Sequence, residues 1–240
     1  MPLSESRPIE PRRVRSYVLR SGRMTDGQRR ALIGLWQRFG LAALPADPAS
    51  VFGRTAACVL EIGFGNGEAL LQRAAAHPDR DYLGLEVHRP GIGHALLGLA
   101  RNRLENVRLV EADATEAISA LGRVFNEICV WFPDPWPKKR HHKRRLIQPE
   151  FVAQIARVLR PGGLLHLATD DEGYAETMHA TIMGNGGFAR HLCSDGNRPD
   201  TRFARRALAA GRTITDLCYL RLALDQDTQM VEPHPQDRAV

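Results

Sequence analysis

Apolar positions along the middle of the chain follow two periods that alternate. Short apolar runs predict buried strands, and each is followed by a segment whose apolar residues recur every three or four positions, as in an amphipathic helix. The predicted strands are 58–62, 82–87, 107–111, 127–132 and 164–169. Strands that alternate with helices predict an α/β fold, a doubly wound sheet with helices on both faces.

The first predicted helix begins after Thr25, a good N-cap residue, and continues to about Phe39. One face of this helix is apolar and consists of Leu32, Leu35, Trp36 and Phe39. Further helices are predicted at 68–76, 90–103, 115–121, 149–159 and 172–183, with a loop at 40–55 and a final pair of strands near 188–194 and 216–224.

These elements predict a single domain at 25–224, flanked by two polar segments. Residues 1–24 are rich in arginine, and the prolines Pro2, Pro8 and Pro11 discourage a long helix, so we expect a flexible basic arm. Residues 225–240 are polar and contain proline, and we expect a disordered tail.

The first predicted strand ends abruptly in three alternating glycines, Gly63, Gly65 and Gly67. Glycine adopts positive φ and lets another molecule lie against the backbone, and the helix that follows offers unpaired N–H groups at its start. The stretch therefore predicts a nucleotide-type ligand site at the first strand–helix junction. An ordinary glycine-rich turn is the alternative.

Acidic residues stand at or near the end of every predicted strand. Ligands of doubly wound sheets bind at these carboxyl ends, so the acids predict one shared site rather than unrelated loop positions. They are Glu61, Glu86, Asp113, Asp134 and Asp170.

The glycine spacing and the acids together indicate the cofactor. A dinucleotide site favours G-x-G-x-x-G, but here the third glycine position holds Glu68, and the acids would repel a pyrophosphate. S-adenosylmethionine carries no phosphate and has a sulfonium cation, which suits acidic surroundings. We expect Glu86 to bind the ribose hydroxyls, Asp113 the adenine amino group and Glu61 the methionine part. A dinucleotide oxidoreductase is disfavoured.

The segment 132–139, FPDPWPKK, follows the fourth strand and contains three prolines in six positions. Prolines fix a rigid irregular loop, which would hold Asp134 and Trp136 near the methyl donor. Trp136 offers a flat face on which a base could stack. Lys138 begins the basic block 138–145, so phosphates would lie next to the pocket.

Charge supports a polyanionic partner. The net charge is +6, and arginine is dense in the first thirty residues as well as in the acid-free block 138–145. Nucleic acid is the commonest partner of such patches. A solvated charged face is the alternative. We expect no membrane span, because no run of about 18 apolar residues exists. We expect no secretory signal, because no apolar stretch follows the arginines of the N-terminus.

The four cysteines, Cys58, Cys129, Cys193 and Cys218, are far apart in the sequence. No C-x-x-C pair is present, so the sequence does not predict a zinc or redox site. We expect buried free thiols in a reducing cytoplasm.

Six stretches in this order resemble the bacterial tRNA (guanine-N(7)-)-methyltransferases, which methylate the variable-loop guanine at tRNA position 46. They are RSYVLRSGRMTDGQ (15–28), LEIGFGNGE (60–68), GLEVHRPGIG (84–93), FPDPWPKKRHHKRR (132–145), ATDDEGYAE (168–176) and TRF (201–203). The resemblance implies a Rossmann-like class I methyltransferase sheet, S-adenosylmethionine as methyl donor, no metal, tRNA as partner and a cytoplasmic location.

The resemblance also implies the site residues. Glu61, Glu86, Asp113 and Asp134 would contact S-adenosylmethionine, and Asp134 is also the family's active-site carboxylate. The cofactor site would be completed by the glycines Gly63, Gly65 and Gly67. The matching substrate-binding positions are Lys138, Asp170, Thr201, Arg202 and Phe203.

One departure from the family pattern T-[KR]-F-E-x-R-G leaves alternatives open. The glutamate is Ala204 and the glycine is Ala207, so one acidic contact is missing or supplied from elsewhere. An RNA-binding protein with a weakened methyltransferase site is one alternative. A methyltransferase for an exocyclic amino group is another, because Asp134-Pro135-Trp136 partly resembles its loop. No obligatory protein partner is indicated, and the chain could be a monomer or a homodimer.

Overall fold

The computed structural model describes residues 16–17, 23–193 and 198–223. Most of the predicted basic arm and the whole predicted tail, 225–240, lie outside the described residues.

The described chain forms one eight-stranded sheet with the order β1-β4-β3-β2-β5-β6-β8-β7. All neighbours are parallel except β8, which runs antiparallel to both β6 and β7. The strands are β1 (Gly40–Leu41), β2 (Ala57–Ile62), β3 (Arg80–Glu86), β4 (Val107–Glu111), β5 (Phe125–Trp131), β6 (Leu159–Thr169), β7 (Phe188–His191) and β8 (Thr215–Arg221). The predicted doubly wound α/β fold is confirmed.

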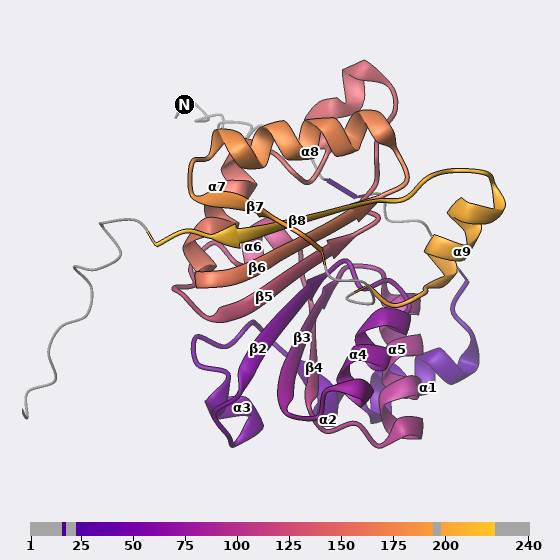
Figure 1. The fold of residues 1–240 in the computed structure, drawn as a ribbon. Helices are drawn as coiled ribbons and strands as arrows, with labels where there is room; N and C mark the ends of the chain where they lie inside the picture. The colour runs from indigo at the N-terminus through magenta and orange to yellow at the C-terminus, as the bar shows by residue number, and fades with distance from the viewer. Residues whose placement is uncertain (1–15, 18–22, 194–197, 224–240) are drawn as a thin grey trace, which may run out of the picture.

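Helices cover both faces of the sheet (Figure 1). Helices α7 and α8 pack on one face, and α1, α4 and α5 lie on the other. The helices are α1 (Asp26–Gly34), α2 (Trp36–Phe39), α3 (Ala49–Phe52), α4 (Glu68–Ala76), α5 (Arg89–Asn102), α6 (Ala114–Ala117), α7 (Pro149–Val158), α8 (Glu172–Gly184) and α9 (Arg202–Ala209), with a 3₁₀ helix η1 (Lys139–Arg144). Within the described ranges, no helix has both the length and the apolar character needed to cross a bilayer.

The central strand β2 shows how the sequence builds the two hydrophobic layers. Side chains alternate along a strand, so Leu60 and Ile62 join the layer under α7 and α8, whereas Val59 joins the layer under α4 and α5. Glu61 lies on the Val59 face and is also buried, at 4% exposure. This buried acid sits at the end of the strand that leads into the glycine turn.

Several local predictions need correction. The helix predicted from Thr25 to Phe39 begins as expected, with a capping box between Thr25 and Gln28, but breaks at Leu35 into α1 and α2. The predicted loop at 40–55 contains the two-residue strand β1, which pairs with β4, and the short helix α3. Strands and helices this short bury too few residues to leave a periodic pattern.

The expectation of four free thiols is half wrong. Cys58 and Cys129 are free and buried, as predicted. Cys193 and Cys218 instead form a disulfide, with their Cα atoms 5.3 Å apart. The sequence did not predict this disulfide, because the two cysteines are 25 residues apart. The antiparallel pairing of β7 with β8 brings them together.

Candidate active site

The sheet order places a crevice at the carboxyl end of β2. Its neighbours β3 and β5 lie on opposite sides, so the chain switches direction there, and ligands of doubly wound sheets bind at such a point. The ends of β2, β3 and β5 carry Glu61, Glu86 and the loop with Asp134. The structure therefore brings these predicted residues to one edge.

The three glycines of the turn all have positive φ: 74° at Gly63, 59° at Gly65 and 79° at Gly67. L-residues with a side chain rarely adopt this conformation, so the turn requires glycine. A Cβ atom at Gly63 would meet no heavy atom of the described chain within 4 Å. Open space thus lies against the backbone at Gly63, as expected for a ligand site.

Glu86 holds the glycine turn in place. Its Oε2 accepts a hydrogen bond from the Gly65 N–H at 2.8 Å, and its Oε1 accepts from Val87 N–H at 2.7 Å and His88 N–H at 2.9 Å. The carboxylate thereby joins the turn after β2 to the turn after β3. Each oxygen has two lone pairs, so Oε2 can still accept a ligand hydroxyl, as predicted for the ribose.

Glu61 is a buried acid whose Oε2 has no hydrogen-bond partner among the described residues. Burial raises the pKa of Glu61 to about 8, against the lowering effect of Arg73, and Glu127 and Glu86 raise it further. The carboxyl is therefore protonated near neutral pH. A cationic ligand group beside this oxygen would favour the ionised form of Glu61, so a buried acid with other acids nearby suits such a group.

This raised pKa makes stability depend on pH. The unfolded carboxyl loses its proton near 4.5 and the folded one near 8. The stability associated with protonated Glu61 is complete below pH 4.5 and is lost as the pH rises toward 8, by up to ~1.4 kcal/mol per pH unit. We expect the unfolding free energy of wild type minus that of Glu61→Gln to fall over this window in urea titrations. Parallel pH curves for the two proteins would contradict the assignment.

Asp113 caps the short helix α6, and its Oδ1 accepts from the Thr115 N–H at 2.8 Å. It also lines a hollow of about 180 Å³ together with Ser16, Arg144 and Gln154. Gln154 Oε1 is buried without a hydrogen-bond partner among the described residues. The sequence did not indicate Gln154, because nothing distinguishes a glutamine on α7 until the sheet brings it beside Asp113.

The loop after β5 has an unusual backbone. Phe132 and Trp136 have positive φ values of 53° and 45°. Such conformations in residues with side chains are rare, and each typically costs about 1–3 kcal/mol. Asp134 lies between them and is exposed at the site edge. The predicted irregular loop is confirmed.

One predicted role of Trp136 needs revision. The Arg144 guanidinium stacks on the indole, 3.7 Å from the ring centroid, and the indole N–H donates to the Ser16 carbonyl at 3.1 Å. His141 meets the same ring edge-on. One face of the indole is therefore covered by Arg144, so a base cannot stack on that face.

The basic block is divided between surface and interior. Lys138, Lys139, Arg140 and Lys143 are exposed on or beside η1. Arg145 is 5% exposed, and its guanidinium donates to the Pro135 carbonyl at 2.8 Å and to Thr177 Oγ1 at 3.1 Å. Arg145 is therefore not free to hold phosphate with the rest of the block, because its donors anchor the Asp134 loop to α8.

Helix α9 lies beside the glycine turn, far from it in sequence (Figure 1). Thr201 caps the helix, with its Oγ1 accepting from the Ala204 N–H. The Arg202 N–H donates to Glu68 Oε2 at 2.7 Å, which ties α9 to the first turn of α4. Phe203 is 54% exposed and stacks on Phe132 with ring centroids 6.3 Å apart. The predicted segment thus reaches the glycine turn.

Ala204, which stands where the family pattern has glutamate, is buried. Ala204 and Ala207 are buried on the inner side of α9. The nearest acid on the neighbouring element is Glu68, which also accepts from the Arg205 guanidinium at 2.7 Å. Although burial opposes the shift, these bonds from Arg205 and Arg202 lower the pKa of Glu68. An ionised carboxylate therefore lies against the start of α9.

Asp170, at the end of β6, is the last of the predicted strand-end acids. Its Oδ2 pairs with the Arg212 guanidinium at 2.7 Å. The Asp170 carboxylate is thus already paired with Arg212. A substrate that binds Asp170 would have to share it with Arg212 or displace Arg212.

A polar cluster that the sequence did not predict lies beneath Glu61. Arg73 on α4 donates to both carboxylate oxygens of Glu127, at 2.7 and 2.8 Å, and contacts Cys129. The Arg73 guanidinium also lies over the Tyr82 and Trp131 rings. The sequence signals for this cluster were Arg73 inside an apolar helix and Glu127 at the start of an apolar strand.

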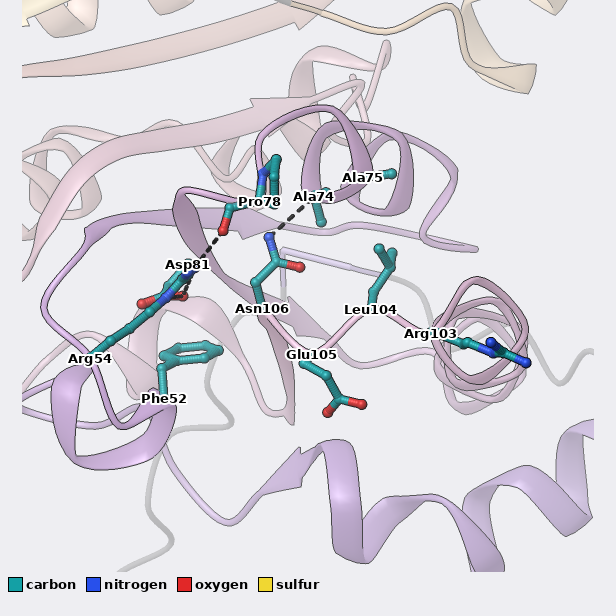
Figure 2. A pocket seen from close by; sticks show the side chains of 10 residues that line it. All are labelled: Phe52, Arg54, Ala74, Ala75, Pro78, Asp81, Arg103, Leu104, Glu105 and Asn106. Carbon is teal, nitrogen blue, oxygen red and sulfur yellow. Dashed lines mark hydrogen bonds and ion pairs between the residues drawn. The ribbon is translucent and has the colours of Figure 1, made fainter.

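A larger hollow, about 330 Å³, lies at the opposite edge of the sheet, where β3 and β4 begin (Figure 2). Arg54 reaches across it to the buried Asp81 and to the Pro78 carbonyl, and Asn106 bonds to the Ala74 carbonyl. The predicted site residues all lie at the other edge, so this hollow is separate from the active site.

Comparisons with known proteins confirm the fold, which is that of the class I S-adenosylmethionine-dependent methyltransferases. The fold matches that of the 16S rRNA methyltransferase KamB, with a TM-score of 0.55 at 17% identity over 72% of this chain and 92% of that chain. It also matches a 16S rRNA adenine methyltransferase from Catenulisporales acidiphilia determined with cosubstrate SAM, with a TM-score of 0.54 at 18% identity over 78% of this chain and 92% of that chain.

The family described as "Putative methyltransferase" matches residues 55–217. A tRNA (guanine-N(7)-)-methyltransferase from Alkalilimnicola ehrlichii is 49% identical over 87% of this chain and 92% of its own length. The enzyme of that name from Nitrosococcus oceani is 48% identical over 89% of this chain and 93% of its own. The chain belongs to the tRNA (guanine-N(7)-)-methyltransferase family, as the sequence motifs indicated.

Proposed function

We propose that this protein transfers the methyl group of S-adenosylmethionine to ring nitrogen 7 of the guanine at position 46 of tRNA. The observation that carries the proposal is the buried Glu61 carboxyl, whose Oε2 has no partner in the described part of the chain, beside the Glu86-held glycine turn. This is the edge where the Asp134 loop and the basic block meet. Membership of the family supports the same reaction.

The residues present suit S-adenosylmethionine, which supplies an electrophilic methyl group on a sulfonium cation. Glu61 would accept from the methionine ammonium and Glu86 from the ribose. Asp113 and Gln154 would hold the adenine edge, and Gly63, Gly65 and Gly67 let the ligand lie against the backbone. We assign Asp134 to both the cofactor and the catalytic step.

Guanine nitrogen 7 carries a lone pair and no proton, so methyl transfer needs no general base. The protein's task is to align the reactants and exclude water. The methylated base is cationic, so a carboxylate at Asp134 would stabilise charge as it develops. Phe203 and Phe132 would screen the reacting atoms from solvent, because Phe203 lies close to Gly65 and stacks on Phe132.

Substrate contacts would come from Lys138 and from the segment Thr201, Arg202 and Phe203. Thr201 acts through its cap on α9, whereas Lys138 and Arg202 are exposed and can reach phosphates. Asp170 would bind the guanine edge if the guanine displaces Arg212 from the carboxylate. The basic arm 1–24 would add phosphate contacts to the single domain 25–224. We expect a cytoplasmic monomer or homodimer that binds tRNA and needs no other protein.

Removing the exposed charges of the basic block should weaken tRNA binding. For Lys138→Ala/Arg140→Ala we expect a lower affinity and a slope of log K against log salt that is shallower by about 1 to 2, because fewer counterions are released. Binding is measured by fluorescence anisotropy at several salt concentrations. The matched control is Arg101→Ala/Arg103→Ala, which removes two exposed arginines at the end of α5. Equal losses in both variants would mean that only net charge matters.

One assay tests the reaction. Labelled S-adenosylmethionine is incubated with unmodified tRNA, followed by borohydride–aniline cleavage, which cuts at guanines methylated on nitrogen 7. Label incorporation with cleavage at position 46 is expected. Incorporation without cleavage would indicate an exocyclic amino group as acceptor. Absent incorporation, with calorimetry showing no cofactor binding, would indicate an RNA-binding protein with a weakened site, the alternative raised by Ala204 and Ala207.

A further inference from the structure

A buried histidine and the disulfide lie together where strands β6, β8 and β7 pair. A ring nitrogen of His166 and the sulfurs of Cys193 and Cys218 all lie within 4.8 Å of one another. Strand pairing explains this arrangement, because His166 on β6 is directly opposite Cys218 on β8, and Cys193 follows β7, the next strand along (Figure 1).

His166 is oriented by a carboxylate. Its Nε2 lies 3.0 Å from Asp216 Oδ1, and Arg198 pairs with the same carboxylate through two hydrogen bonds of 2.8 and 3.0 Å. The guanidinium of Arg198 can only donate, so the Asp216 carboxylate accepts from it and from His166 Nε2–H, which leaves the lone pair of the imidazole on Nδ1.

That lone pair has no donor in the described chain. His166 is 1% exposed, and Nδ1 is a buried atom without a hydrogen-bond partner there. A disulfide cannot donate to it, so the disulfide form leaves a buried acceptor unsatisfied, which is unfavourable. The free thiol Cys129 also faces His166 from β5, but it contacts Arg73 and Glu127 instead.

We propose that, when the Cys193–Cys218 disulfide is reduced, the two thiolates and His166 Nδ1 bind a zinc ion. Thiolate and imidazole are the ligands that zinc prefers, and a carboxylate on the far ring nitrogen is the usual outer partner of a zinc-bound histidine. Bond lengths of about 2.0 to 2.3 Å place tetrahedral ligands about 3.4 to 3.8 Å apart. Ligand atoms within 4.8 Å need little more than opening of the sulfur–sulfur bond. Water would fill the fourth position.

The chemistry is a balanced exchange. A dithiol reductant gives two electrons and two protons to the disulfide, becomes a disulfide itself and leaves Cys193 and Cys218 as thiols. Zinc then displaces the two thiol protons. Disulfides rarely persist in reducing compartments, so the zinc form would be the one present there. In either form the bridge joins the end of β7 to β8, just before the segment that leads to Thr201.

Cobalt(II) titration of the full-length protein tests the site. The protein is reduced with a phosphine, which competes little for metal, and the phosphine is removed under nitrogen. We expect one equivalent of cobalt to give thiolate charge-transfer absorption and the visible bands of tetrahedral coordination, both abolished by one equivalent of zinc. Oxidised protein should give neither. Cys193→Ser should lose most of the charge-transfer band, and Asp216→Asn should weaken binding ~10- to 100-fold.

The matched control is Cys58→Ser, which removes a buried thiol on the opposite face of the sheet and should leave the spectrum unchanged. Cys193 is only half-buried and follows β7, so its replacement by serine is not expected to prevent folding, and circular dichroism checks this. Reduced wild type without tetrahedral bands would overturn the proposal and leave a simple disulfide. Bands that persist equally in Cys193→Ser would also overturn it, because they would place the metal elsewhere.

Discussion

Asp134→Ala is expected to lose methyl transfer by ~100-fold or more, the size seen when a group that stabilises transition-state charge is removed. Asp134 lies in the strained loop after β5, at the edge that holds Glu61 and Glu86, and its side chain is exposed. Because tRNA is held mainly through phosphates by basic residues, its affinity should change by no more than about three-fold. Single-turnover kinetics and anisotropy measure the two quantities.

Two further variants sharpen this result. Asp134→Asn keeps the shape and removes the charge, so it should be nearly as slow as alanine if the charge stabilises the cationic base. If Asp134 only accepts hydrogen bonds from the guanine edge, asparagine should recover part of the rate through its carbonyl oxygen. Asp79→Ala, an exposed acid before β3 at the opposite edge, serves as control. Full activity of Asp134→Ala would remove the residue from the mechanism.

The largest stability effect is expected from Glu127→Ala, which should lower the unfolding free energy by about 3–5 kcal/mol. Glu127 and Arg73 are both more than nine-tenths buried, and the two-oxygen contact between them neutralises the guanidinium. Removing the carboxylate leaves a buried charge without its partner. Urea unfolding gives the change, provided that the slope of free energy against urea concentration stays constant.

The double variant Arg73→Leu/Glu127→Leu distinguishes this cause from simple loss of packing. Replacing a buried ion pair with apolar residues is often close to neutral, so the double variant should be more stable than Glu127→Ala. If the double variant loses as much unfolding free energy as Arg73→Leu and Glu127→Leu lose in sum, the pair contributes through packing around Tyr82 and Trp131.

The sequence predicted the central sheet because its strands are long, apolar and separated by helices of regular period. The turn at Gly63, Gly65 and Gly67 was also predictable, because the positive φ that it requires is open to glycine and rare for other residues. Acids at strand ends converge in any parallel sheet, so the positions of Glu61 and Glu86 followed from topology. Their hydrogen bonds did not, because Glu86 turns back onto the peptide N–H groups of its own neighbourhood.

Residues whose role depends on distant contacts were not predictable. Arg145 belongs to a run of basic residues and differs from them only through Pro135 and Thr177, which approach it in the folded chain. The Arg144 stack on Trp136 and the Cys193–Cys218 disulfide have the same origin. Local sequence describes a residue's chemistry, whereas these contacts are decided by which strands and loops become neighbours.

The position of β8 has a consequence for how the protein folds during its synthesis on the ribosome. This strand is the last described element of the chain, yet it lies between β6 and β7. During synthesis, β6 therefore emerges with an open edge, and β7 has no strand to pair with until β8 follows it. Unpaired strand edges invite association with other chains. The vulnerable interval ends only when residue 221 has left the exit tunnel and β8 can insert.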